Sequence, residues 1–345
     1  MNDEKRRRGA RLERSRASAQ FDDGKFKNPS GATPAIEGSS LSIMGEFFFR
    51  RGRREPSAPL PLDRPHETWS RPVSTGLRVT WLGHSTVLLE MDGRRVLTDP
   101  VFGDRASPVS FAGPKRFHPV PAALEELPPL DAVLLSHDHF DHLCRPTMES
   151  LARTRVPIVT ALGVGAHLEA FGIDPTRITE LDWHEHAEVA GVRFTANPSQ
   201  HFSGRSLTDR NRTLWASWVI ESSRRKVFFS GDTGLFPELA DIGTRHGPFD
   251  LVMLEVGAYH PAWGTIHLGP ENALTAFDML GGGTLLPVHW GTFNLGLHDW
   301  DDPAETLLTL AEPRRARIVT PRIGSAFEPE HIDSPTPWWR AVPPR

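Results

Sequence analysis

The sequence predicts an α/β fold. Short apolar stretches alternate with helical patterns through the middle of the chain, and this alternation is typical of the class. Several of the apolar stretches are apolar on both faces, so helices or a second sheet must cover each side of them. The 345 residues, of which 38% are hydrophobic, are enough for one large domain or two modest ones.

Composition divides the chain into three regions. Residues 1–30 are charged, are punctuated by glycine and lack an apolar period, so we expect a disordered basic arm. Residues 31–76 are expected to form an N-terminal extension that includes the proline-rich connector EPSAPLPLDRP. Residues 77–345 carry the alternating pattern and are expected to form the main domain.

The main domain is expected to open with strands at 78–82, 86–91 and 94–98, separated by the turn formers GHS and DG. A further strand at 131–136 is apolar on both faces and should be buried. The elements expected next are a helix at 145–154, a strand at 156–160, a helix at 161–172 and a strand at 178–182.

The second half of the main domain shows the same alternation. A hairpin is expected from strands at 213–222 and 225–230, followed by buried strands at 249–256 and 284–290. Between these two, a well-signalled helix has Pro270 in its first turn, keeps its apolar residues on one face and stops at Gly281.

The stretch SHDHFDHL follows the buried strand at 131–136 and crowds polar side chains at its end. Imidazole and carboxylate groups are the ligands that borderline divalent cations prefer. His137 and His139 point the same way if the backbone is extended, whereas Asp141 and His142 fall on the following turn and can reach a second ion. A solvated turn is the alternative, but the spacing favours half of a dinuclear metal site.

Three further candidates each follow an apolar strand: His201 ends FTANPSQH, Asp232 follows VFFSG, and His289 follows LLPV. Alone, each could be a capping or core residue. Together they predict that His201 completes the first ion's set and that His289 completes the second. Asp232 is expected to bridge, because a carboxylate between two cations offsets their repulsion. We expect two zinc ions, with iron or manganese as alternatives.

The motifs HDHFDH, SGDTG and PVHWGTF resemble those of the metallo-β-lactamase superfamily, whose fold is a four-layer αβ/βα sandwich. Longer stretches, among them VTWLGHSTVLLEMD, LTDPVFGDRASPVSFAGPKRF and EVGAYHPAW, resemble the N-acylphosphatidylethanolamine-hydrolysing phospholipase D family over about residues 78–300. The resemblance implies the same seven ligands. It also implies that His267 and Asp141 are catalytic, with His267 near the departing group, and that His84 and Asp99 support the ligands from outside.

Three positions depart from the mammalian pattern of that family. Phe140 and Arg145 stand where those members carry tyrosines, and Gly269 stands where they carry an aspartate. The metal chemistry survives these changes, but the lipid contacts and bile-acid regulation of those members are not carried over.

The expected function is hydrolysis by a hydroxide that bridges two metal ions. The favoured substrate is a phospholipid of the N-acylphosphatidylethanolamine type, cleaved by a phospholipase D-like phosphodiesterase. A lactonase or other ester hydrolase is the alternative. A nucleic-acid nuclease is less favoured, because a formal charge of -4 gives no basic face, and a non-enzymatic binding module would be expected to lack ligands.

The expected location is the cytoplasm. The single cysteine, Cys144, fits a reducing compartment and is expected to be a buried thiol rather than a ligand. No stretch approaches the roughly 20 apolar residues of a membrane span. The stretch LSIMGEFFFRRGRR, from Leu41 to Arg54, joins an apolar cluster to four arginines and predicts peripheral contact with the inner face of a membrane. Packing of this stretch on the domain is the alternative.

Overall fold

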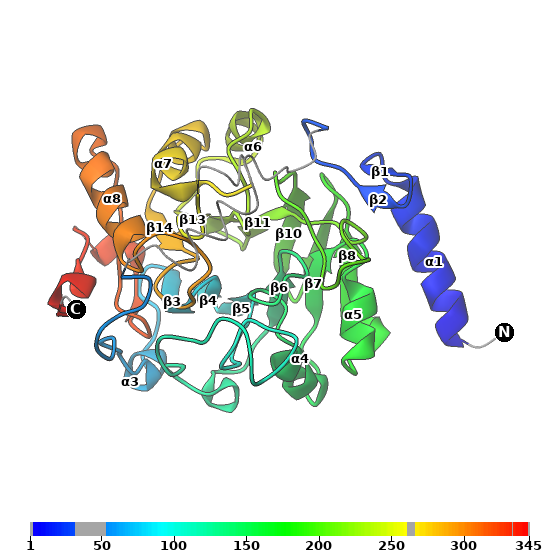
Figure 1. Ribbon diagram of the computed structural model, residues 1–345, viewed down its shortest axis with the longest axis horizontal. Coiled ribbons are helices and arrows are strands. Elements are labelled where there is room, and N and C mark those ends of the chain that lie inside the picture. The colour runs from blue at the N-terminus through cyan, green and yellow to red at the C-terminus, as the bar shows by residue number, and fades with distance from the viewer. Residues whose placement is uncertain (1–2, 32–52, 261–265, 333, 344–345) are drawn as a thin grey trace.

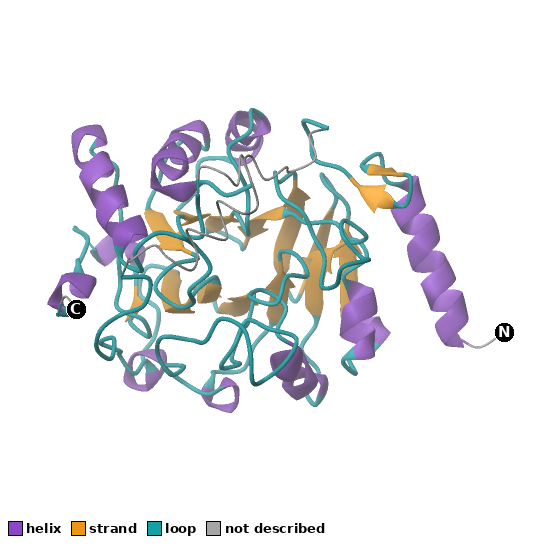
Figure 2. Cartoon of the chain, in the orientation of Figure 1, coloured by secondary structure: helices purple, strands orange, loops and turns teal. Residues whose placement is uncertain are grey.

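Two large β-sheets stack against each other at the centre of the molecule, and helices cover the outer face of each sheet (Figures 1 and 2). They are seen in a computed structural model that describes residues 3–31, 53–260, 266–332 and 334–343. This arrangement is the expected four-layer αβ/βα sandwich, so the predicted fold class is confirmed. The helices on one side are α3 (His66–Trp69), α4 (Arg145–Ala152) and α5 (Gly165–Ala170), and those on the other are α6 (Glu238–His246), α7 (Gly269–Met279) and α8 (Asp302–Ala311).

The first sheet has seven strands. They are β3 (Leu77–Gly83), β4 (Thr86–Met91), β5 (Arg94–Thr98), β6 (Ala132–Leu135), β7 (Ile158–Ala161), β8 (Ile178–Leu181) and β15 (Ala326–Phe327). Their order in the sheet is β15, β3, β4, β5, β6, β7, β8. Strands β3 to β5 form an antiparallel meander, whereas β5 to β8 run parallel, with α4 between β6 and β7 and α5 between β7 and β8. The bounds of β4 and β5 are those that the sequence predicted.

The second sheet has six strands. They are β9 (His186–Val189), β10 (Val192–Asn197), β11 (Ser217–Glu221), β12 (Lys226–Phe229), β13 (Leu251–Glu255) and β14 (Leu285–Val288). Strands β9 to β12 pair antiparallel, so the predicted hairpin is confirmed in β11 and β12, and β12 to β14 pair parallel. The edge strand β9 was not predicted, because its charged residues carry no apolar pattern.

Alternate residues of one strand serve two different layers. On β4, Leu88 belongs to the same buried cluster as Met148 of α4, whereas Leu89 belongs to the cluster that contains Trp218 of the second sheet. This double burial explains why the strands read as continuous apolar runs. Short helical turns complete the chain at Leu124–Glu126, Pro175–Arg177, Glu312–Arg314, Pro329–His331 and Trp338–Ala341.

The N-terminal segment is structured where the sequence analysis expected a disordered arm. Helix α1 (Asp3–Ala17) precedes a small hairpin of β1 (Phe21–Asp22) and β2 (Lys25–Phe26), and it projects at one end of the molecule (Figure 1). Arg11 Nη2 donates to Glu169 of α5 at 2.7 Å, and Arg11 Nε donates to Glu180 of β8. An apolar period is not needed for this helix, because its residues are good helix formers and ion pairs of Arg11 attach it to the main domain.

The stretch from Leu41 to Arg54 lies outside the described residues except at its last two arginines. The backbone N–H of Arg53 donates to Asp299 Oδ1 at 2.8 Å, so this end of the stretch is attached to the domain. The expected membrane contact stays a prediction. Among the residues that the structure describes, no helix is long and apolar enough to cross a bilayer.

Candidate metal centre

The candidate ligands gather because they follow the ends of strands from both sheets. The first sheet supplies the segment after β6 and the turn between β3 and β4. The second sheet supplies the segments after β10, β12 and β14. The residues placed in this way are His84, His137, His139, Asp141, His142, His201, Asp232 and His289.

One group contains His137, His139, His201 and Asp232, whose ligand atoms lie within 4.8 Å of one another. His139 Nδ1 lies 2.8 Å from His137 Nε2 and 3.3 Å from His201 Nε2. Asp232 Oδ2 lies 3.8 Å from His137 Nε2 and 3.7 Å from His201 Nε2. The structure therefore brings together the three histidines that the sequence assigned to the first ion, with Asp232 beside them.

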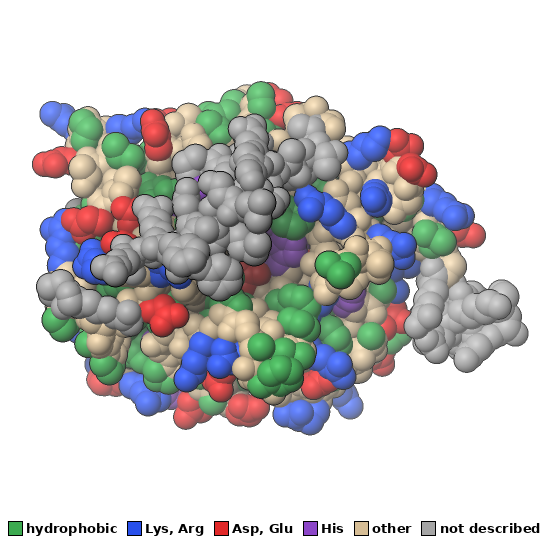
Figure 3. Space-filling model, in the orientation of Figure 1, with side chains coloured by type: hydrophobic (Ala, Val, Ile, Leu, Met, Phe, Trp, Pro, Cys, Tyr) green, Lys and Arg blue, Asp and Glu red, His purple; other side chains and the backbone are tan. Residues whose placement is uncertain are grey.

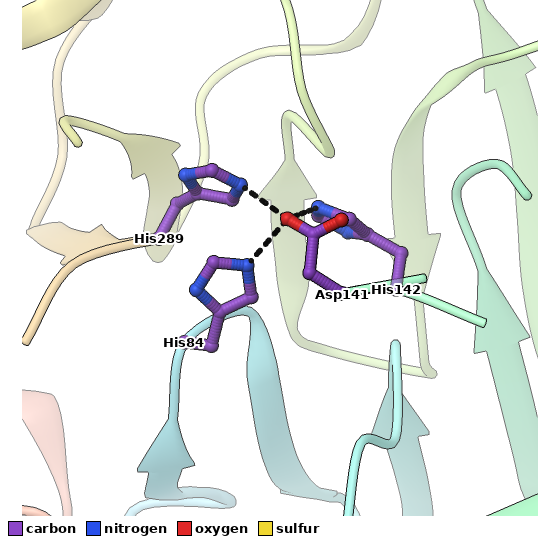
Figure 4. Close-up of side chains that lie close together, drawn as sticks. All are labelled: His84, Asp141, His142 and His289. Carbon is purple, nitrogen blue, oxygen red and sulfur yellow. Dashed lines mark hydrogen bonds and ion pairs between the residues drawn. The ribbon is translucent and has the colours of Figure 1, made fainter. Parts of the chain in front are cut away.

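The second group contains His84, Asp141, His142 and His289 (Figure 4). Asp141 Oδ2 lies 3.0 Å from His84 Nε2, 3.3 Å from His289 Nε2 and 3.5 Å from His142 Nε2. His84, expected only as a supporting residue, thus reaches Asp141 directly from the turn between β3 and β4.

Asp232 faces both groups. Its Oδ1 lies 3.1 Å from His142 Nε2 and 3.2 Å from His289 Nε2, while its Oδ2 is turned toward the first group. A carboxylate with one oxygen toward each set of nitrogen donors has the geometry of a bridging ligand. The predicted bridging role of Asp232 is compatible with this placement.

The donor atoms at the centre fit a pair of divalent cations. His142 Nε2 and Asp232 Oδ1 are buried and lie 3.1 Å apart as an ion pair, but within the described part of the chain neither atom has a hydrogen bond of good geometry. A buried polar atom without a partner is costly unless another interaction compensates. Coordination of a cation by imidazole nitrogen and carboxylate oxygen is such an interaction.

The electrostatics of the cluster favour cations. Burial opposes the ionisation of Asp232, but His142 and His289 hold the pKa of this carboxyl well below its usual range. Burial lowers the pKa of a histidine, yet at His289 the nearby Asp232 and Asp141 outweigh it and raise the pKa to about 10. Without an ion the carboxylates therefore favour protons on His142 and His289, whose pKa values are raised, and a bound cation would displace those protons. Burial lowers the pKa of His137, His139 and His201, which leaves these imidazoles neutral and able to coordinate.

Asp99 contacts the candidate ligand His142, for which the resemblance predicts a supporting residue. Its Oδ2 accepts from His142 Nδ1 at 2.6 Å, and its Oδ1 accepts from the Ser136 N–H at 2.7 Å. Such outer hydrogen bonds fix the orientation of a metal-binding imidazole.

The backbone is strained at three residues of the centre. His84, Asp99 and His289 have φ values of 53°, 33° and 65°. Left-handed backbone at a residue other than glycine costs on the order of 1–3 kcal/mol and is concentrated at functional sites. The strain is held in part by mutual contact, because the N–H of His289 donates to His84 O at 3.1 Å.

His267 lies at the edge of the centre with a partner that the sequence analysis missed. Its ring centroid is 5.1 Å from that of His201 and 5.6 Å from that of His289, and its Nδ1 lies 2.7 Å from Glu255 Oε2. Burial lowers the pKa of His267, but Glu255 outweighs it and leaves the pKa raised. The sequence feature that could have identified this partner is Glu255 itself, a polar residue at the end of the apolar stretch LVMLEV. The other site residues likewise follow apolar strands.

The N-terminal segment contacts one of the candidate ligands. Asn28 Oδ1 accepts from the His201 N–H at 2.9 Å and from Trp215 Nε1 at 3.1 Å. Phe26, which is 1% exposed, anchors this part of the segment in the core. The segment therefore reaches the centre from outside the main domain.

Replacing Asn28 with alanine is expected to weaken metal binding about 10-fold, the lower end of the range for outer partners of a ligand. The buried N–H of His201 would lose its acceptor, at a cost of about 1–3 kcal/mol, whereas Trp215 Nε1 would keep Ser199 O at 2.8 Å. Competition with a chromophoric chelator measures the affinity. Ser30→Ala, which removes the hydroxyl that donates to Gln200 Oε1 at 3.2 Å, is the control. Equal affinities for Asn28→Ala and the unaltered chain would contradict this role.

A cavity of about 850 Å³ opens beside the stretch SHDHFDHL, residues 136–143. Phe140 and Leu143 line it, and Phe140 stacks under Arg205 with the guanidinium carbon 4.0 Å from the ring centroid. Arg145 also lines the cavity, and so does Cys144, which is buried and belongs to no candidate metal group of the described residues. Figure 3 shows histidine side chains at the surface beside hydrophobic ones on the face that it draws.

Aromatic side chains that are close to the candidate site residues in the sequence fall into three cases. The Phe202 ring centroid is 4.6 Å from that of His139, so Phe202 borders the first group. Phe293 packs edge-on against His84 at 5.3 Å, whereas Trp290 stacks on Trp81 in the core. Trp263 lies outside the described residues.

Comparisons with known proteins place similarity over the same region. A family model described as the Beta-lactamase superfamily domain matches residues 94–290. An uncharacterized protein of Mycobacterium tuberculosis strain H37Rv is 45% identical over 332 residues, which cover 94% of this chain and 88% of that protein. The N-acyl-phosphatidylethanolamine-hydrolyzing phospholipase D 1 of Caenorhabditis elegans is 36% identical over 271 residues, covering 74% of this chain and 76% of that protein.

Two solved structures share the fold at low sequence identity. The metallo hydrolase Igni18 of Ignicoccus hospitalis has a TM-score of 0.56 at 22% identity, and the match covers 73% of this chain and 98% of that one. An isothiocyanate hydrolase from Delia radicum gut bacteria has a TM-score of 0.58 at 22% identity, with the same two coverages. At this identity the likeness supports the fold alone.

Proposed function

The chain belongs to the metallo-β-lactamase superfamily of metal-dependent hydrolases, and from this membership we propose that it is a dinuclear phosphodiesterase of phospholipase D type. The proposed substrates are phospholipids that resemble N-acylphosphatidylethanolamine. The observation that carries the proposal is the position of Asp232 between two nitrogen-rich groups, with His267 at their edge. The similarity to a relative named for that phospholipid supports the choice of bond.

The proposed ligands divide between two ions, for which we expect zinc, with iron or manganese as alternatives. When bound, two such cations lower the pKa of a water molecule and offset the negative charge of a phosphodiester. Asp232 would be shared by both sets, because its Oδ1 lies near His142 and its Oδ2 near His201. The first ion would be held by His137, His139 and His201, and the second by Asp141, His142 and His289.

The protein side chains would position the ligands, donate a proton to the departing oxygen and bind the lipid. Asp141, which faces His84, His142 and His289, keeps the second group of donors together at the place of reaction. His267 would protonate the departing oxygen from Nε2, the ring nitrogen opposite the one bonded to Glu255. The cavity beside Phe140 would receive part of the lipid, because Phe140 and Leu143 give it an apolar lining next to the candidate ligands.

A parallel assay of the metal-loaded chain tests the substrate class. The substrates are N-acylphosphatidylethanolamine in mixed micelles, a small chromogenic phosphodiester and a panel of lactones, and the metal-stripped chain is the control. We expect turnover of the lipid and the diester above that of every lactone. Lactone hydrolysis faster by about 10³ in kcat/KM, or about 4 kcal/mol of transition-state preference, would instead assign the site to a lactonase.

A further inference from the structure

The buried carboxylate of Glu255 meets His267 at the edge of the centre. We propose that Glu255 is a positioning residue that fixes the orientation and tautomer of His267, so that Nε2 faces the reaction. The proposal rests on the proposed function, because it assigns His267 the role of proton donor to the departing group. It adds a residue that neither the sequence motifs nor the names of the relatives assign.

Glu255 is itself held rigidly. Its side chain is 0% exposed at the end of β13, and Oε1 accepts the backbone N–H groups of Thr233 at 2.9 Å and of Leu268 at 3.2 Å. Oε2 then lies 2.7 Å from His267 Nδ1. Because Leu268 directly follows His267, one carboxylate holds both the side chain of the histidine and the backbone beside it.

The alternative role for Glu255 is that of a further metal ligand. Glu255 Oε2 lies 3.9 Å from His289 Nδ1, and Glu255, His267, Asp232 and His289 have ligand atoms within 4.8 Å of one another. Both oxygens of Glu255 are already engaged, one by backbone N–H groups and one by His267. Coordination would break those contacts, so the geometry favours the positioning role.

The contact determines which nitrogen carries which function. A carboxylate can only accept, so Nδ1 must carry a hydrogen and Nε2, across the ring, takes the proton that is delivered and regained. During hydrolysis the water oxygen forms a bond to phosphorus and the bond to the departing oxygen breaks, with its electron pair staying on that oxygen. The departing oxygen takes the Nε2 proton, and the proton lost by the attacking water restores it, so His267 undergoes no net change.

Glu255→Gln is the sharpest change because it keeps the shape and reverses the hydrogen bond. If the amide oxygen keeps the two backbone N–H groups, the amide NH₂ faces Nδ1, which must then accept, and the tautomer of the ring is inverted. Glu328→Gln is the matched control, because Glu328 also accepts backbone N–H groups, those of Ser74 and Thr75, but belongs to no candidate metal group of the described residues.

Kinetics with two phosphodiesters separate positioning from a general structural effect. The two substrates share one substituent and release either 4-nitrophenol, which needs little protonation, or a simple alcohol, which needs it. For Glu255→Gln we expect kcat on the alcohol-releasing diester to fall on the order of 10²-fold, with kcat on the nitrophenyl diester within about 3-fold. In the His267→Ala background, Glu255→Gln should have no further effect on either substrate. Equal losses on both diesters, or additive losses in the double variant, would overturn the proposal.

A spectroscopic readout decides the point independently of activity. In ¹⁵N-labelled protein at a pH where the His267 ring is neutral, the His267 signal, identified by its loss in His267→Ala, should show a hydrogen on Nδ1 in the unaltered chain and on Nε2 in Glu255→Gln. An unchanged tautomer, or loss of a metal ion from Glu255→Gln in elemental analysis, would overturn the positioning role. If the loaded chain turns over neither diester, the proposed function is wrong, while the tautomer still tests the contact between Glu255 and His267.

Discussion

Replacing Asp232 with alanine is expected to reduce hydrolysis by about 10³-fold or more and to remove at least one of two metal ions. Loss of an outer partner of a ligand alone costs about 10–100-fold, and Asp232 faces both groups of donors directly. His142 and His289 would also lose the Asp232 carboxylate, whose Oδ1 now lies 3.1 Å and 3.2 Å from their Nε2 atoms and offsets the positive charge of these imidazoles. Elemental analysis of carefully loaded protein, together with kcat on the best substrate, measures both effects.

The exposed ion pair of Asp278 with Arg314 supplies a control for this experiment. Asp278→Ala removes a carboxylate from the surface of α7 and should leave metal content and rate unchanged. Bound metal also adds about 2.7 kcal/mol to the stability of the native chain at a free concentration 100 times the Kd, so a chelator should lower the Tm of the unaltered chain more than that of Asp232→Ala. One ion or none in the unaltered chain, or full activity of Asp232→Ala, would refute the dinuclear assignment.

Replacing His267 with alanine is expected to lower kcat by about 10²–10⁴-fold, the usual range for a general acid or base. Both ions should remain, because the two groups that contain the proposed ligands do not require His267. The measurement pairs kcat with metal content for the same preparation. Retention of both ions with a large loss of rate would separate His267 from the ligands.

His186, exposed on the edge strand β9, is the matched histidine for that comparison. His186→Ala should behave as the unaltered chain does, since its side chain lies in no candidate metal group of the described residues. Turnover at the unaltered rate in His267→Ala would remove His267 from the reaction. Loss of a metal ion from the His267→Ala variant would instead make His267 part of the metal site.

The sequence predicted those parts of the molecule that depend on local pattern. Buried strands such as β4 were recognisable because both of their faces are covered, and His137, His201 and His289 stood out as titratable residues directly after such strands. The pairing of two sheets into four layers followed only from the resemblance of motifs. Which sheet a strand joins is decided by contacts between distant residues, and a local pattern does not record them.

Two residues at the centre were missed for different physical reasons. Glu255 occupies the same position after a strand core as the recognised candidates, but a single glutamate there carries no spacing that marks it. Asn28 lies in the segment expected to be disordered, and its partner His201 is far away in the sequence. Its importance comes from a contact that forms only when the N-terminal hairpin docks.

At His84, Asp99 and His289, where the backbone is strained, a substitution that raises stability would remove a side chain of the site. Glycine adopts such φ values readily, so each of these positions offers relief of on the order of 1 kcal/mol or more to a library selected for heat resistance. The relief is available only by deleting an imidazole or carboxylate that faces the centre or supports it. Selection for thermostability alone would therefore favour variants that are more stable and inactive. These three positions have to be kept unchanged in such a library.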